Sequence, residues 1–380
     1  ICGVCGIGDI KLLGKIGTKS FGFYMLTTAV AIASAILIAM AIGIGEGMNA
    51  SSSAEFSARE APALSEVLIN IIPRNPINAM AQGEMLSIIF FAILLGVSLL
   101  LVGKKARTVI ELIEILNEAM MKMVSIIMAL APYAVFCLLA KAMAELGVEL
   151  FAQLIGFVLV AGGVMLLHLF VTLLFFLKAF SGLNPVTFLK KIRNVQVFAF
   201  STSSSNATIP VTLRTVTERM GVNNSVASFT APFGATINMD GTAIMQGVAT
   251  VFIANLYGVE LGIAGYLTVI MMSVLASIGT AGVPGAGLIM LSMVFAQVGL
   301  PLEGIGLILG VDRLLDMLRT AVNVSGDAVV SLVVAKSEGK LDEAVYNDDA
   351  IERSDKGGIH VNSEVGRDFS QAMAKAYKGK

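Results

Sequence analysis

The sequence has little charge and few of the residues that build most active sites. Of its 380 residues, 14% are Asp, Glu, Lys or Arg, two are histidines, three are cysteines and none is tryptophan. The net charge of −1 excludes the basic surface that nucleic-acid binding requires. By contrast, 56% of the residues are hydrophobic and the mean hydropathy is +0.84, which excludes an ordinary soluble domain. The composition indicates a membrane protein.

The scarcity of histidine and cysteine also argues against an enzyme. Cys2 and Cys5 form one C-x-x-C pair without a second ligand pair, so apolar packing is a better interpretation than a zinc site. His168 and His360 are the only histidines, and neither is placed to activate the serine cluster at 201–205. We expect a structural role for His168, and an intramembrane enzyme is a weak alternative.

Four apolar runs in the first half are long enough to cross a bilayer, which takes about 20 residues. They lie at 21–45, 85–103, 119–142 and 150–180. Basic residues gather before the first run, after the second and after the fourth, whereas the other loops are acidic or neutral. By the positive-inside rule, the basic ends are cytoplasmic. Charge and hydrophobicity therefore predict the same alternating topology.

In the second half, polar residues interrupt the apolar runs. We expect a re-entrant hairpin from the cytoplasm at 194–216, another from outside at 264–300, and a span at 225–257 that is broken at 238–242. Non-helical backbone at membrane depth must be buried or line a cavity, and interrupted segments of opposite orientation are typical of secondary transporters. Glycines that merely permit close helix packing are the alternative. The predicted fold is an all-α polytopic membrane protein with inverted repeats, opposed hairpins and broken helices.

Five polar residues share one face of the last span, 304–336. They are separated by steps of four, three, four and four residues: Asp312, Asp316, Arg319, Asn323 and Asp327. Charges at membrane depth are costly, so this face is expected to line a wet cavity or meet partners. The structural alternative is an internal salt bridge of Asp312 or Asp316 with Arg319 or Arg313. Together with Asp240 of the broken span, the region has a formal charge of −3, which predicts bound cations.

Four segments make the sequence similar to a known family. The segments 203–205, 238–242, 277–287 and 316–327 resemble, in this order, the signatures of the glutamate transporter family, the dicarboxylate/amino acid:cation symporters. The chain is similar to archaeal aspartate transporters and bacterial sodium–glutamate carriers from about residue 1 to 339. The resemblance implies eight spans and two hairpins, so we expect the first two helices to precede Ile1.

The resemblance implies a substrate site around Arg319, which would grip the side-chain carboxylate of an acidic amino acid. Asp316 would bind the ammonium group, and Asn323 with Ser204 would bind the α-carboxylate. The implied substrate residues are Thr202, Ser203, Ser204, Thr242, Val283, Gly287, Asp316, Arg319, Thr320 and Asn323. No catalytic residue is expected.

The resemblance also implies three sodium ions as coupling ions, bound by three groups of residues. The groups are Gly234, Asn238, Asn323 and Asp327; Thr236, Ser277, Ile278 and Thr280; and Tyr24, Thr27, Thr28, Asn238 and Asp240. In the second group the ligands would be mostly carbonyls. Tyr24, Thr27 and Thr28 have no sequence signal beyond the resemblance, because such residues in an apolar helix usually pack or bond to the backbone.

The implied function is sodium-coupled symport of glutamate or aspartate by alternating access. Proton-coupled symport of glutamate or of C4-dicarboxylates, and an anion-conducting channel, are the alternatives. Archaeal members of the family have an arginine at the position of Thr202 and animal members have one at Met317, and this chain has neither.

The resemblance implies that different parts of the chain form a scaffold, a transport core and a tail. Residues 1–150 would be mainly scaffold and trimer contacts, with the span at 19–45 joining the transport core, and residues 151–338 would form that core. The tail at 339–380 would be polar and cytoplasmic. We expect a homotrimer in the plasma (inner) membrane, in contact with lipid and not with nucleic acid.

Overall fold

The computed structural model describes residues 1, 5, 13–47, 72–82, 85–128, 133, 136–137, 140, 149–278, 280 and 282–348. Within these ranges the chain forms helices and no β-strand, which confirms the all-α prediction. An isolated antiparallel bridge joins Val222 to Leu341.

The elements, in chain order, are the following: η1 Leu13–Gly17, α3 Thr18–Ile42, α5 Pro76–Gln82, α6 Met85–Val102, η2 Gly103–Ala106, α7 Arg107–Met128, α9 Glu149–Leu167, η3 His168–Thr172, α10 Leu173–Ser181, α11 Pro185–Thr202, α12 Ser205–Arg214, η4 Thr215–Arg219, α13 Asn224–Ile237, α14 Asp240–Leu256, α15 Gly262–Ser277, α16 Ala286–Val298, α17 Gly304–Ser337 and α18 Glu343–Asn347. The elements η1, η3 and η4 are π-helical and η2 is a 3₁₀ helix.

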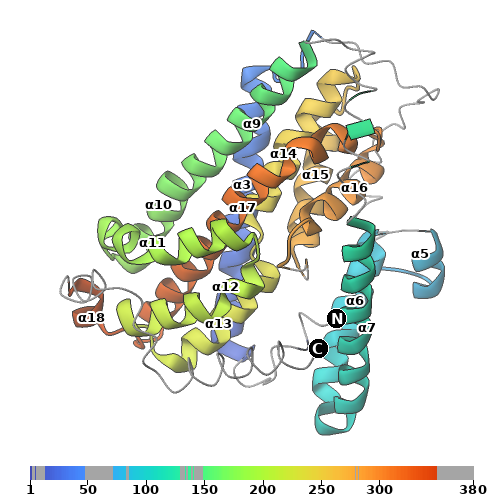
Figure 1. The fold of residues 1–380 in the computed structure, drawn as a ribbon. Helices are drawn as coiled ribbons and strands as arrows, with labels where there is room; N and C mark the ends of the chain where they lie inside the picture. Colours follow the sequence, from blue (N-terminus) through green and yellow to red (C-terminus); the bar gives the residue numbers. More distant parts are fainter. Residues whose placement is uncertain are drawn as a thin grey trace, which may run out of the picture.

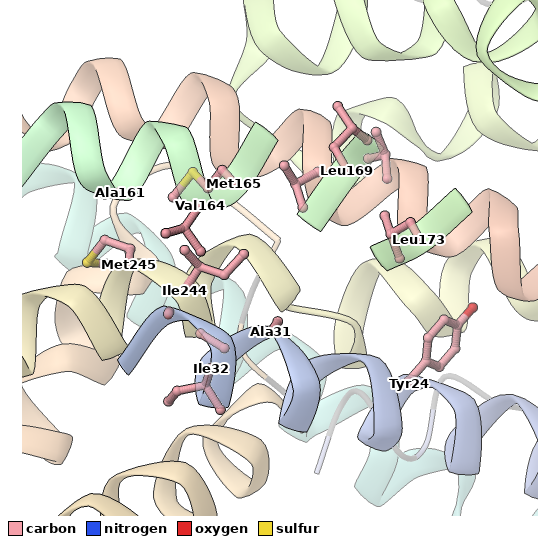
Figure 2. Close-up of a cluster of buried hydrophobic side chains, with 14 of the residues drawn as sticks. Tyr24, Ala31, Ile32, Ala161, Val164, Met165, Leu169, Leu173, Ile244 and Met245 are labelled. Carbon is pink, nitrogen blue, oxygen red and sulfur yellow. The ribbon is translucent and has the colours of Figure 1, made fainter. Parts of the chain in front are cut away.

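Helix α17 lies at the centre of the main bundle and contacts α9, α10, α11, α13 and α14 (Figure 1). Around it, α3 packs along α14, while α9 contacts both of them. Apolar side chains of the three helices interlock between them, with Ile32 of α3, Met165 of α9 and Ile244 of α14 all fully buried (Figure 2). Helices α6 and α7 lie to one side of this bundle (Figure 1). These helices therefore pack around α17 through buried apolar side chains.

Three helical stretches in the described residues are long and apolar enough to cross a membrane. They are Gly14–Ile42, Ala152–Ser181 and Gly304–Ser337, and each coincides with a predicted span. The predicted span at 119–142 falls partly on α7, which is Arg107–Met128, and partly outside the described residues. That span stays a prediction.

The polar interruptions fall where the sequence placed them. Helices α11 and α12 are joined at Ser203–Ser204, α13 and α14 at Asn238–Met239, and α15 ends at Ser277 before α16 begins at Ala286. The first pair begins earlier than the predicted residue 194, because Asn184 caps α11 by accepting a hydrogen bond from the Val186 amide at 2.9 Å. Re-entry of the two pairs from opposite membrane faces stays a prediction.

The segment that follows α17 ties the base of α11 to the rest of the bundle. The Asp342 amide donates to the Gly221 carbonyl at 2.8 Å, and the buried Tyr346 hydroxyl donates to the Asn184 carbonyl at 2.9 Å. At the end of α17, Glu338 forms an ion pair with Lys19 of α3. The hydrogen bond from Lys19 lowers the pKa of Glu338, so on acidification this ion pair persists to a pH below the usual range of glutamate titration.

Lys191 of α11 is the buried anchor of this arrangement. Its side chain is 3% exposed, and its ammonium donates to the carbonyls of Arg219 and Val345, each at 2.7 Å. Lys191→Met is expected to destabilise the protein by about 2–4 kcal/mol, because two buried carbonyls lose a charged donor. The change should appear as a lower apparent melting temperature in detergent. Lys190→Met, at the exposed neighbour, should leave it nearly unchanged, and equal melting of the two variants would contradict the prediction.

Candidate functional site

A small, partly open cavity lies where α14, α17 and the two helix pairs meet. Its volume is about 20 Å³, which is room for a water molecule and not for an amino acid. The lining residues are Ser203, Ser205, Met239, Thr242, Thr280, Gly282, Val283, Ala286, Gly287, Asp316, Arg319, Thr320 and Asn323. All the predicted substrate residues are in this lining except Thr202 and Ser204. The structure therefore brings together residues of four helices, α12, α14, α16 and α17, and of the segments that join the helix pairs.

Arg319 dominates the charge of this cavity. Its guanidinium forms an ion pair with Asp316, one turn earlier in α17, and a second one with Asp312 at 3.3 Å. All three side chains are at most 7% exposed. The alternative of an internal salt bridge is thus what the structure shows, with both carboxylates on one arginine. Because a guanidinium has five N–H donors in a planar fork, it can exchange one of these partners for a substrate carboxylate.

The tips of the two helix pairs touch and cover the cavity. The Ser204 hydroxyl donates to the Gly282 carbonyl at 2.8 Å, and the Asn206 amide donates to the same carbonyl at 3.1 Å. Ser204 also caps α12 by accepting from the Ala207 amide at 3.2 Å, while the Thr202 hydroxyl bonds to the Phe198 carbonyl. These bonds explain why Ser204 and Thr202 are not in the lining.

Ser203 supplies the cavity with a free hydroxyl at the tip of the first pair. Its backbone has φ 50°, an uncommon left-handed conformation that ends α11. The hydroxyl oxygen is buried and has no hydrogen-bond partner within the described structure. A buried unpartnered donor is costly, so this hydroxyl is suited to a ligand that enters the cavity.

The break between α13 and α14 places amide and carboxylate groups against α17. The Asn238 side-chain amide donates to the Asp327 carboxylate and to the Asn323 carbonyl, each at 2.9 Å. The Asn238 side-chain oxygen is buried and has no partner among the described atoms. Above it, the Asn323 side-chain oxygen accepts from the Gly241 amide at 2.8 Å. An orphaned oxygen beside a buried carboxylate is a donor set that suits a small hard cation.

Asp240, the first residue of α14, is fully buried and hydrogen-bonded on both oxygens. Its Oδ1 accepts from the hydroxyls of Thr27 at 3.2 Å and Thr28 at 2.7 Å, while its Oδ2 lies 3.0 Å from His168 Nε2. The start of a helix favours a negative charge. The third predicted sodium group is therefore assembled around Asp240, and His168 joins it from η3.

Tyr24 connects this group to the Asn238 group. Its fully buried hydroxyl donates to the Thr230 carbonyl at 3.0 Å. A Cβ built on Gly234 would lie 2.7 Å from the Tyr24 hydroxyl and would also overlap Asp327. Only glycine at this position lets the tyrosine and the carboxylate approach α13 from two sides.

The remaining predicted sodium group is less clearly formed. The hydroxyls of Thr236, Ser277 and Thr280 donate to carbonyls of their own segments, and the Ile278 amide bonds to the Leu275 carbonyl at 3.1 Å. The tip nevertheless approaches the end of α13, because a Cβ on Gly282 would lie 2.8 Å from the Ala235 carbonyl. Any ion bound here would depend on backbone carbonyls.

Several residues at the site are not among the predicted site residues. Asp312 is predicted only as part of the polar face, and His168 is predicted only to have a structural role. The cavity lining adds Ser205, Met239, Gly282 and Ala286, which lie within or beside the four signature segments. The sequence does carry a signal for His168: it lies in an apolar run, where its ring is expected to be buried, and a buried polar ring needs a hydrogen-bond partner.

Gly241 keeps α14 close to α17 beside the cavity. A Cβ at this position would lie 2.6 Å from the Arg319 carbonyl and 2.9 Å from its Cα, and backbone cannot move aside as a flexible side chain can. Gly241→Ala is therefore expected to destabilise the protein by about 1–3 kcal/mol and to displace Arg319 beside the cavity. A lower melting temperature in detergent measures the destabilisation. Gly162→Ala, whose Cβ would have an ordinary contact at 3.8 Å, is the matched control and should leave the melting temperature unchanged.

Comparisons with known proteins identify the family of this chain. The family model for the sodium:dicarboxylate symporter family matches residues 1–337. The chain is 33% identical over 352 residues to the proton/sodium-glutamate symport protein of Geobacillus stearothermophilus, covering 90% of this chain and 83% of the relative. It is 33% identical over 371 residues to the proton/glutamate-aspartate symporter of Escherichia coli (strain K12), covering 94% and 84%. It is also 32% identical over 358 residues to the C4-dicarboxylate transport protein of Bacillus subtilis (strain 168), covering 90% and 83%.

These matches extend across the helices that build the cavity and the buried carboxylates. They confirm the resemblance based on the four signature segments, and they indicate a multi-pass transporter of the plasma membrane and not an enzyme. The family supports secondary transport of glutamate or C4-dicarboxylates. The chain belongs to the sodium:dicarboxylate symporter family.

Proposed function

We propose that the protein is a sodium-coupled symporter of the acidic amino acids glutamate and aspartate that works by alternating access. The observation that carries the proposal is the buried Arg319, which lines a small cavity and is held by two carboxylates. A C4-dicarboxylate would present two carboxylates to this site, whereas an amino acid also presents an ammonium group. Asp316 beside Arg319 offers a partner for that ammonium, which favours an amino acid.

Binding would proceed by exchange of partners inside the cavity. The substrate side-chain carboxylate takes Arg319 N–H donors that Asp312 and Asp316 now use, and Asp316 turns to the ammonium. Asn323 and the Ser203 hydroxyl face the α-carboxylate. The 20 Å³ cavity must first expand, and separation of the Ser204–Gly282 contact between the tips is the movement that opens it.

Sodium ions would balance the buried negative charge during this exchange. Two donor sets suit them: Asn238 with Asp327, and Asp240 with Thr27 and Thr28. Three ions are proposed, the third at the carbonyls near Thr236 and Ser277. When bound, each supplies one positive charge and draws on the sodium gradient. One monovalent cation per monoanion is electroneutral and gives only about tenfold accumulation from a tenfold gradient, so more than one ion is needed for strong concentration.

The moving unit is proposed to comprise 151–338 and the span at 19–45, with the second helix pair as outer gate. The remainder of residues 1–150 would be scaffold in a homotrimer, and the tail would be cytoplasmic. The ion pairs of Lys15 and Lys19 with Glu338, which link α3 to the end of α17, support the inclusion of α3 in the moving unit.

Uptake of labelled glutamate into proteoliposomes tests the proposal. An inward sodium gradient should drive accumulation that unlabelled aspartate blocks and succinate does not. A proton gradient alone should give little uptake. Accumulation driven by a proton gradient without sodium would contradict sodium as the coupling ion and indicate protons. Stronger competition by succinate than by aspartate would contradict an acidic amino acid as the substrate and indicate a C4-dicarboxylate. Substrate-dependent anion current without accumulation would favour a channel.

A further inference from the structure

His168 belongs to no predicted substrate or sodium group, yet it forms a hydrogen bond with Asp240 of the third predicted sodium group. The His168 Nε2 and the Asp240 Oδ2 are 3.0 Å apart, and both side chains are fully buried. The two residues are 72 positions apart in the chain and belong to different helices. A polar contact at this depth needs a reason, because desolvating both groups is costly.

The helix itself is distorted at the histidine. His168 is the first residue of the π-helical turn η3, His168–Thr172, which joins α9 to α10. Such turns insert one extra residue into an α-helix and often occur at functional sites. Apolar side chains before and after the turn, such as Met165 and Leu173, stay in the core (Figure 2). The turn therefore places His168 toward α14 while the apolar face of the helix remains packed.

The two carboxylate oxygens of Asp240 have different hydrogen-bond partners. Oδ1 faces the hydroxyls of Thr27 and Thr28, and Oδ2 faces His168. An ionised carboxylate only accepts hydrogen bonds, so His168 Nε2 carries the proton. His168 Nδ1 is buried without a partner in the described part of the chain. A neutral ring leaves only an acceptor unpaired there, whereas a charged ring would bury an unpaired N–H.

We propose that His168 is a positioning residue for a coupling sodium ion. By donating to Oδ2, it fixes the carboxylate of Asp240 so that Oδ1 stays with Thr27 and Thr28, where the ion is proposed to bind. The inference rests on the proposed function, since it assumes a sodium ion at Asp240. Hydrogen bonds to metal-binding carboxylates typically alter metal affinity 10–100-fold when they are removed.

The test compares three variants in the full-length protein, reconstituted in proteoliposomes. His168→Leu removes the donor, and His168→Gln supplies an amide N–H close to the position of Nε2. Met165→Leu changes a buried residue one turn away that makes no polar contact with Asp240. For each variant, the sodium concentration for half-maximal glutamate uptake is measured, together with the KM for glutamate at saturating sodium. Melting temperature without sodium shows that the proteins are folded.

His168→Leu is expected to raise the half-maximal sodium concentration about 10–100-fold and to leave the KM for glutamate within about threefold. His168→Gln should recover most of the sodium affinity, and Met165→Leu should resemble the parent protein. An unchanged sodium requirement in His168→Leu, or an equal rise in His168→Leu and His168→Gln, overturns the positioning role. If the parent protein takes up glutamate without regard to sodium, the proposed coupling fails and this inference fails with it, which is a distinct result.

Discussion

Arg319→Cys is expected to abolish concentrative uptake of glutamate and to let the protein carry neutral amino acids. The guanidinium fills the wall of the cavity, since a Cβ on Gly287 would lie only 2.5 Å from its Nη1. Truncating one partner of a buried, hydrogen-bonded charge pair costs about 2–5 kcal/mol, which corresponds to about 30–4000-fold in affinity. A neutral amino acid has no side-chain carboxylate that needs Arg319, so its binding does not lose this ion pair in the variant. The ratio of kcat/KM for glutamate over that for serine is the measurement.

Arg313 offers a matched control on the same helix. Its side chain is exposed and lines an outer apolar hollow with Val158 and Met317, away from the Asp316–Arg319 pair. Arg313→Cys should keep the preference for glutamate within a few fold. Arg319→Lys retains the charge but loses the planar fork, so it should give an intermediate loss. A preference for glutamate that survives in Arg319→Cys would contradict the role of Arg319 as the selectivity residue.

The positions of the interruptions could be predicted from the sequence because their causes are local. Asn238 and Met239 interrupt a run that is otherwise apolar, and Ser203–Ser204 combine a left-handed residue with a helix-capping hydroxyl. Such signals act over a few residues. The start of α11 was misplaced although its signal was present, since Asn184 followed by Pro185 is a typical N-cap and first helical position. The basic residues within α11 were interpreted as the end of a loop.

Contacts between distant segments could not be predicted in the same way. Periodicity placed Asp312, Asp316 and Arg319 on one face, and it even suggested a salt bridge, but not that both carboxylates bind one guanidinium. The hydrogen bond from His168 to Asp240 depends on the packing of η3 against α14 and on a π-turn that has no sequence signature here. Helix packing decides these contacts, and a single sequence does not encode it in any local pattern.

Asp327→Asn is expected to raise the sodium concentration that uptake requires while the protein remains folded. Asp327 is 2% exposed, and its Oδ1 accepts from the Asn238 amide at 2.9 Å beside the unpartnered Asn238 oxygen. The asparagine has nearly the same shape but lacks the charge that offsets a buried cation. Loss of one partner from a buried charge pair costs about 2–5 kcal/mol, so sodium affinity should fall at least about 30-fold.

The measurement is the sodium dependence of glutamate uptake together with the number of sodium ions that enter with each glutamate. Glu303→Gln, at an exposed carboxylate just before the same helix, should leave both unchanged. In Asp327→Asn the uptake at high sodium should recover only partly, and the ratio of sodium to glutamate should fall, because one binding place has lost its charge. If the ratio and the sodium affinity both matched the parent protein, Asp327 would be a structural partner of Asn238 and the ion would have to bind elsewhere. The pairing of Asp327 with Asn238 alone does not explain the orphaned Asn238 oxygen, whereas a cation between the two groups would satisfy it.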